Sequence, residues 1–170
     1  MPENKEIDEI VKTLDLQSHP EGGFFKETYR SSGTISPSDL PSTIETPRNY
    51  STCIYFLLTS DNFSAFHKIH QDEIWHHYKG NKLMLHCISP EGEYRAIEIG
   101  SDLRQGQVPQ FVVPAGHYFA AEILDPDSYA LSGCTVSPGF DFQDFIMPTR
   151  MELTAMFPQH AEVIRRLSRE

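Results

Sequence analysis

The sequence contains few basic residues and few cysteines. Its 170 residues include 14 Lys and Arg against 24 Asp and Glu, which gives a formal net charge of −10 at pH 7. A nucleic-acid-binding surface needs clustered cations that displace counterions from phosphates, so we expect no nucleic-acid partner. The three cysteines, Cys53, Cys87 and Cys134, are far apart and form no CxxC pair. This pattern argues against a disulfide framework and favours free thiols in a reducing compartment.

Long apolar segments are scarce as well. No apolar run in the sequence approaches the ~20 residues that a membrane-spanning helix needs. The first ten residues, MPENKEIDEI, are polar and acidic, unlike a signal or transit peptide. We therefore expect a cytoplasmic protein with no membrane partner. A length of 170 residues with 39% hydrophobic side chains is typical of one globular domain.

The spacing of apolar residues predicts helices only near the two ends of the chain, within residues 1–18 and within residues 151–170. Between them lie many short segments rich in β-branched and aromatic residues, separated by turns with Gly and Pro. We predict an all-β fold in which residues 1–170 form a single domain. Its architecture would be a jelly-roll barrel, or double-stranded β-helix, with short terminal helices. The segment 33–49, rich in Ser, Thr and Pro, is expected to be a long loop.

The segment 66–80 carries the densest set of chemically active side chains, with the sequence FHKIHQDEIWHHYKG. Imidazole and carboxylate groups bind divalent metals, and histidine also titrates near neutral pH. Alternate residues of a strand share one face, so Glu73, Trp75 and His77 are expected to point together. A buried Glu73 needs a partner, because an isolated buried charge is costly. The segment therefore predicts either a metal site or a site for acid–base chemistry.

Four blocks of sequence together resemble one family. They are HPEGGFFKETYR at 19–30, the segment 66–80, PQFVVPAG at 109–116 and GCTVSPGFDFQDF at 133–145. Within them, the spacing from Glu73 to Gly80 and the run from Gly106 to Gly116 resemble the two cupin motifs. The chain is thus similar to an uncharacterised family among the RmlC-like cupins. The resemblance implies a cupin barrel, which is a jelly roll, and a homodimer, and it implies no established reaction.

The resemblance to cupins also implies a set of metal ligands, from which this sequence departs. The usual His-x-His pair is replaced by His67-Lys-Ile-His70. Phe119 occupies the position of the expected histidine of the second motif, and His117 lies two residues earlier. Two alternatives follow: the barrel holds no metal, or it holds a divalent ion through His67, His70, Glu73 and His117.

The expected barrel also predicts a ligand. Barrel mouths commonly bind small molecules, so we expect a pocket for a small polar molecule that resembles a sugar or a nucleotide. His67 or His77 is the candidate general base, with Glu73 orienting it, as in an epimerase or isomerase. Further candidates for contact with the ligand are His70, Trp75, Gln110, His117, Tyr118 and Tyr129. Two alternatives stay open, a divalent-metal-dependent enzyme of the oxygenase or isomerase type and a non-catalytic ligand sensor.

Two other features are interpreted as structural. His19 lies next to Pro20 and is interpreted as a turn residue. Phe140, Phe142 and Phe145 are expected to anchor the end of the chain to the barrel or to a partner subunit. Neither feature is predicted to contribute to the site.

Overall fold

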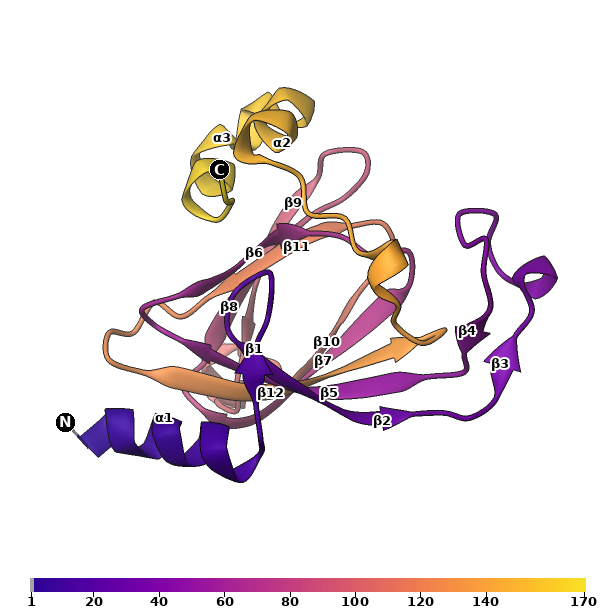
Figure 1. Cartoon of the computed structure of the whole chain (residues 1–170). Helices are drawn as coiled ribbons and strands as arrows, with labels where there is room; N and C mark the ends of the chain where they lie inside the picture. Colours follow the sequence, from indigo (N-terminus) through magenta and orange to yellow (C-terminus); the bar gives the residue numbers. More distant parts are fainter. Residues whose placement is uncertain (1) are drawn as a thin grey trace.

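The computed structural model describes residues 2–170 and consists mainly of two antiparallel sheets (Figure 1). One sheet contains β1 (Gln17–Ser18), β2 (Phe24–Arg30), β5 (Thr52–Thr59), β12 (Tyr129–Ser137), β7 (Asp72–Gly80) and β10 (Gln110–Val113), in that order. The other contains β6 (Phe63–His67), β11 (Tyr118–Glu122), β8 (Leu83–Ile88) and β9 (Tyr94–Ile99). A short helical turn, η2 (Leu103–Gln105), connects β9 to β10. The predicted all-β jelly roll is confirmed.

The two sheets face each other and enclose the main core. Side chains alternate along each strand, so one face of each sheet points inward. Phe56 of β5, Trp75 of β7 and Phe119 of β11 meet there, each 1% exposed. The ring centroids of Phe56 and Trp75 are 5.5 Å apart, and those of Trp75 and Phe119 are 6.4 Å apart, both in edge-to-face contact. Each of these buried rings contributes roughly 2–3 kcal/mol to folding.

Helices pack against the outer faces of both sheets (Figure 1). Apolar residues of α1 (Pro2–Thr13) contact Leu57 and Tyr129 on the six-stranded sheet. The C-terminal α2 (Arg150–Met156) and α3 (Ala161–Arg166) cover the four-stranded sheet. Among residues 2–170, no helix is long and apolar enough to cross a bilayer.

The C-terminal segment that we predicted as one helix is two. Pro158 follows α2 and has no N–H with which to continue the helical hydrogen bonds. The short turn η4 (Pro158–His160) then redirects the chain into α3. The predicted N-terminal helix is present and ends at Thr13, where the chain turns through Asp15 with a φ of 52°.

The predicted loop 33–49 forms an arm beside the barrel (Figure 1). It contains β3 (Thr34–Ile35), the turn η1 (Pro37–Asp39) and β4 (Arg48–Asn49), and the two strands pair with each other. Arg48 of β4 is 3% exposed and donates two hydrogen bonds to Asp144, at 2.6 and 2.7 Å. The arm is therefore fixed to the chain that follows β12.

Candidate functional site

A cavity of about 250 Å³ lies between the sheets and adjoins the core at Phe56. Three kinds of side chain line it: titratable groups deep inside, aromatic rings, and charged groups at the mouth. The titratable groups come from the turn before β2 and from β6 and β7. The lining residues are His19, Glu21, Phe25, Glu27, Arg30, Thr52, Ile54, Phe56, His67, Ile69, Glu73, Cys134, Val136, Phe140, Asp141, Phe142 and Phe145.

Glu21 enters the cavity because a glycine turn holds it against β6. Gly22 has a φ of 117°, and a Cβ at this position would lie 2.0 Å from the Phe63 carbonyl oxygen, so only glycine fits. The Glu21 carbonyl accepts a hydrogen bond from the Ala65 N–H at 2.8 Å, which fastens the turn to β6. The Glu21 side chain, in a residue 5% exposed, is thereby placed next to the ring of His67.

Glu21 and His67 form a buried ion pair. The Glu21 Oε2 atom lies 2.9 Å from His67 Nε2, and Oε1 accepts a hydrogen bond from the Ser64 hydroxyl at 2.9 Å. His67 Nδ1 donates to the Ala65 carbonyl at 2.7 Å, so both ring nitrogens are engaged. Burial works against both charges, but their mutual attraction outweighs it: the pKa of His67 is raised and the pKa of Glu21 is lowered. Both shifts favour the ionised form of the pair.

Glu73 is the second carboxyl group of the cavity, and its environment differs from that of Glu21. It lies on β7 opposite Val136 of β12 and Val113 of β10, and it is 8% exposed. Among the described residues, no lysine, arginine or histidine nitrogen lies within 4.0 Å of its carboxylate. Burial raises the pKa of Glu73 to about 7, with the His67 charge opposing the shift and Glu21 adding to it. Glu73 is therefore partly protonated at neutral pH.

His19 is also part of the cavity wall, which corrects our interpretation of it as a turn residue only. Its side chain is 7% exposed, and its Nδ1 atom accepts a hydrogen bond from the Glu21 N–H at 3.2 Å. Burial lowers the pKa of His19, so the ring is neutral. The ring packs edge-on against Phe25 with a centroid separation of 4.6 Å. A histidine followed by Pro-Glu-Gly-Gly did not indicate this role, because only the docking of the turn on β6 reveals it.

Aromatic rings close the outer part of the cavity. Phe140, Phe142 and Phe145 follow β12, with edge-to-face centroid separations of 4.9 to 6.5 Å. The turn η3 (Phe142–Asp144) is held in place because buried Asp144 accepts hydrogen bonds from Arg48 and from Gln71. We had expected these rings to anchor the chain, and they line the cavity as well.

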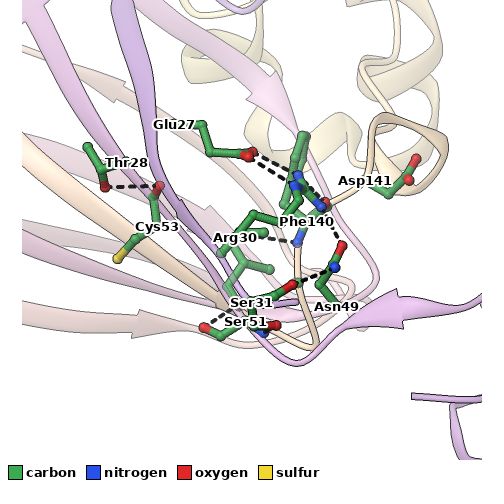
Figure 2. A network of polar contacts seen from close by, with 12 residues as sticks. Glu27, Thr28, Arg30, Ser31, Asn49, Ser51, Cys53, Phe140 and Asp141 are labelled. Carbon is green, nitrogen blue, oxygen red and sulfur yellow. Dashed lines mark hydrogen bonds and ion pairs between the residues drawn. The ribbon is translucent and has the colours of Figure 1, made fainter. Parts of the chain in front are cut away.

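Arg30 and Glu27 of β2 are exposed residues of the cavity lining, at its mouth. Figure 2 shows the polar contacts around them. The Arg30 guanidinium donates to both carboxylate oxygens of Glu27, at 2.9 and 2.8 Å. It also donates to the Asn49 side chain at 2.8 Å and to the Phe140 carbonyl at 3.1 Å. Every nitrogen of Arg30 is therefore engaged with the protein.

Of the residues proposed from the sequence, only His67 and Glu73 line this cavity. His77 shares a strand with Glu73 but lies four residues further along β7, about 13 Å away at the usual rise per residue. Its Nε2 atom contacts the Asn81 carbonyl at 3.1 Å. Trp75 lies inside the core, and Gln110 contacts His76, whose side chain points to the opposite face of β7 from Glu73.

Four further candidates also lie outside the cavity lining. Tyr118 points away from the inward-facing Phe119 and packs under α2 and α3. Tyr129 packs against α1, where its hydroxyl donates to Glu6 at 2.8 Å. His70 follows β6 and His117 precedes β11, each in a turn, and neither lines the cavity. Sequence alternation alone did not indicate which strand ends open into the cavity.

The donor groups do not fit the metal site that the resemblance implied. His67 pairs with Phe119 in the ladder between β6 and β11, and the two rings are 4.1 Å apart, so a phenyl ring takes the place of a ligand. Both nitrogens of His67 are already engaged, as described above. Within residues 2–170, no set of three His, Cys, Asp or Glu side chains is arranged to hold a metal ion. His67, His70, Glu73 and His117 are not brought together.

Comparison with known proteins identifies the family of this chain. Residues 8–148 match the model of the cupin superfamily family DUF985. The uncharacterized protein YML079W of Saccharomyces cerevisiae is 36% identical over 155 residues, which cover 85% of this chain and 76% of that protein.

Solved structures of proteins with similar sequences have the same fold. Protein SO0799 from Shewanella oneidensis is 41% identical, with a TM-score of 0.86 over 95% of this chain and 96% of that one. A hypothetical protein from Leishmania major is 32% identical, with a TM-score of 0.87 over 96% and 98%. Oxalate decarboxylase from Bacillus subtilis, 14% identical with a TM-score of 0.54 over 90% and 37%, shares the fold alone. The chain belongs to the DUF985 family of the cupin superfamily.

Proposed function

We propose that this protein binds a small polar molecule in the cavity and moves a proton on it, in a reaction of the isomerase or epimerase type. The observation that carries the proposal is that the Glu73 carboxyl is buried and faces the cavity, with no cationic nitrogen of the described residues within 4.0 Å. Its pKa of about 7 suits a group that both accepts and releases a proton at neutral pH. Strongly shifted groups in a cavity mark candidate functional sites.

The contacts of His67 change the roles that we assigned from the sequence. Both of its nitrogens are engaged, by Glu21 and by the Ala65 carbonyl, so His67 has no free lone pair with which to accept a proton. We therefore assign the proton transfer to Glu73. The Glu21–His67 pair acts on Glu73 through its charges: the charge of Glu21 raises the pKa of Glu73, and the charge of His67 lowers it.

The proposed step is balanced without any further reactant. The Glu73 carboxylate takes a proton from an acidic C–H bond of the bound molecule, and the bonding electrons stay on that molecule. The protonated Glu73 then returns the proton to the same or a neighbouring atom. Phenylalanine rings form much of the cavity wall, and electrostatic interactions are stronger in such apolar surroundings than in water.

The size of the cavity limits the ligand. Small-molecule sites are commonly about 300–1,000 Å³, and this cavity of about 250 Å³ lies below that range. It suits a molecule of monosaccharide size, or the reacting part of a larger one. A complete sugar nucleotide would extend through the mouth, where Arg30 is already engaged with Glu27.

The test combines a binding screen with hydrogen exchange. Sugars, amino sugars, organic acids and nucleotides are screened by thermal shift, and each hit is incubated with the protein in deuterated water. NMR should detect deuterium at one carbon of the ligand with the wild type and with the control His117→Ala. Glu73→Gln should abolish this exchange and keep the protein folded. Binding with no exchange in the wild type would contradict the proton transfer and favour a ligand sensor.

A further inference from the structure

The lining of the cavity has an excess of acidic groups. Four carboxylates line it, against a single arginine and two histidines. Arg30 is neutralised by Glu27, and the charged His67 is neutralised by Glu21. His19 is neutral, because burial lowers its pKa and its Nδ1 atom accepts a hydrogen bond. The charges that remain in the lining are those of Glu73 and of Asp141 at the mouth.

Glu73 is the deeper of these two groups and faces the ligand space directly. More than nine-tenths of the residue is buried, and no cationic nitrogen of the described chain lies within 4.0 Å of its carboxylate. Asp141 instead caps η3, where it accepts the Gln143 N–H at 2.8 Å. A buried anion without a counter-ion is costly, so a positive group supplied by a ligand would relieve that cost.

The rings around Glu73 add a second reason to expect a cation. Five phenylalanines line the same cavity: Phe25, Phe56, Phe140, Phe142 and Phe145. The face of an aromatic ring carries negative potential, which attracts ammonium groups, and aromatic cages bind quaternary ammonium ions in this way. An anionic ligand would meet these faces and the carboxylates, and the described part of the lining offers it no free cation, because every Arg30 nitrogen is engaged.

We propose that the molecule bound in this cavity is a cation, with an ammonium group placed between the Glu73 carboxylate and the phenylalanine rings. The proposal rests on the proposed function, because it concerns the ligand of the same site, and it narrows that ligand to amines and quaternary ammonium compounds of small size. Amino sugars and small amino alcohols belong to this class. Phosphorylated sugars and free nucleotides do not.

The test compares a cation with a neutral molecule of the same shape and with an anion. Choline and dimethylbutanol, its neutral isostere with carbon in place of nitrogen, are titrated into the full-length protein by calorimetry at pH 8, with inorganic phosphate as the anionic probe. Choline should bind at least about tenfold more tightly than the isostere, as expected for a desolvated cation–π contact. Phosphate should not bind. Any measurable preference for the isostere or for phosphate would overturn the proposal.

Three variants assign the binding to the cavity. Glu73→Gln should weaken choline binding at least about tenfold, since it removes the facing charge and keeps the side-chain shape. Phe142→Ala, at a ring that is 52% exposed, should weaken it without disturbing folding. Glu93→Gln, an exposed control on the turn between β8 and β9, should have no effect. Equal choline affinity in wild type and Glu73→Gln would overturn the cation proposal.

The two proposals fail separately. If choline does not bind, or binds no better than its isostere, the cation proposal is wrong, whereas deuterium exchange into a neutral ligand would still support the proton transfer by Glu73. If choline binds through Glu73 and no ligand undergoes exchange, the cation proposal stands and the proton transfer is wrong.

Discussion

Replacing Glu73 by glutamine should stabilise the protein at alkaline pH, although Glu73 is the central residue of the proposed site. Burial raises its pKa from 4.5 to about 7. A carboxyl whose pKa is raised on folding stabilises the folded state while it is protonated, and this contribution is lost as the pH rises through the folded-state value. Integrated from pH 5 to pH 8, the loss amounts to about 2.5 kcal/mol. Glutamine cannot ionise, so the variant should not show this loss.

The assay is urea unfolding of the wild type, Glu73→Gln and the exposed control Glu93→Gln at pH 5 and pH 8. The free energy of unfolding of Glu73→Gln, relative to wild type, should increase by about 2.5 kcal/mol between the two pH values, or roughly 5–10 °C in melting temperature. Glu93→Gln should follow the wild type. The cost of burying the amide cancels, because it is the same at both pH values. An unchanged difference would refute the assignment of a raised pKa to Glu73.

Four further predictions concern ion pairs and metal binding. Asp144→Asn should lower the free energy of unfolding by about 3–5 kcal/mol in the same denaturation assay, because it leaves buried Arg48 without its counter-ion. Glu27→Gln removes the exposed Glu27–Arg30 pair and should lower the free energy of unfolding by less than about 1 kcal/mol. Glu21→Gln should lower the pKa of His67, which NMR of its ring follows, and an unchanged titration would contradict the ion pair. The pairing stabilises the protein fully between about pH 4.5 and pH 6.5. This contribution is lost as the pH rises through the raised pKa of His67 and as it falls through the lowered pKa of Glu21. Chelation should leave the melting temperature of the untagged protein unchanged, since the donors do not fit a metal site, and a stoichiometric metal that His67→Ala removes would contradict this.

The sequence predicted the barrel because strand alternation and turn residues are local properties. Each of the segments β5, β7 and β12 is typical of a strand in its own sequence, and the spacing from Glu73 to Gly80 resembles a cupin motif. The inward face of β7 could not be assigned from the sequence. Which other residues join Glu73 depends on contacts between distant segments. Glu21 precedes His67 by 46 positions and reaches it only because the glycine turn docks on β6. No pattern within the turn itself indicates that docking.

The alternation of side chains along a strand did not predict how far the cavity extends along β7. His77 is two positions beyond Trp75, yet the cavity ends before it, since the core fills the barrel there. The phenylalanines after β12 were recognised as a cluster, but their position over the cavity depends on the buried contact between Arg48 and Asp144. The homodimer and the cytoplasmic location stay predictions.

The proposed proton transfer depends most on one property, a carboxyl that is half protonated at neutral pH inside the cavity. The direct measurement is a carbon-13 NMR titration of the protein labelled at glutamate side-chain carboxyls, from pH 3 to pH 9. We predict one resonance with a midpoint near pH 7, in keeping with the raised pKa of Glu73, and its absence from the spectrum of Glu73→Gln. If every glutamate resonance titrates below pH 5, Glu73 is an ordinary carboxylate and the proposed proton transfer is wrong.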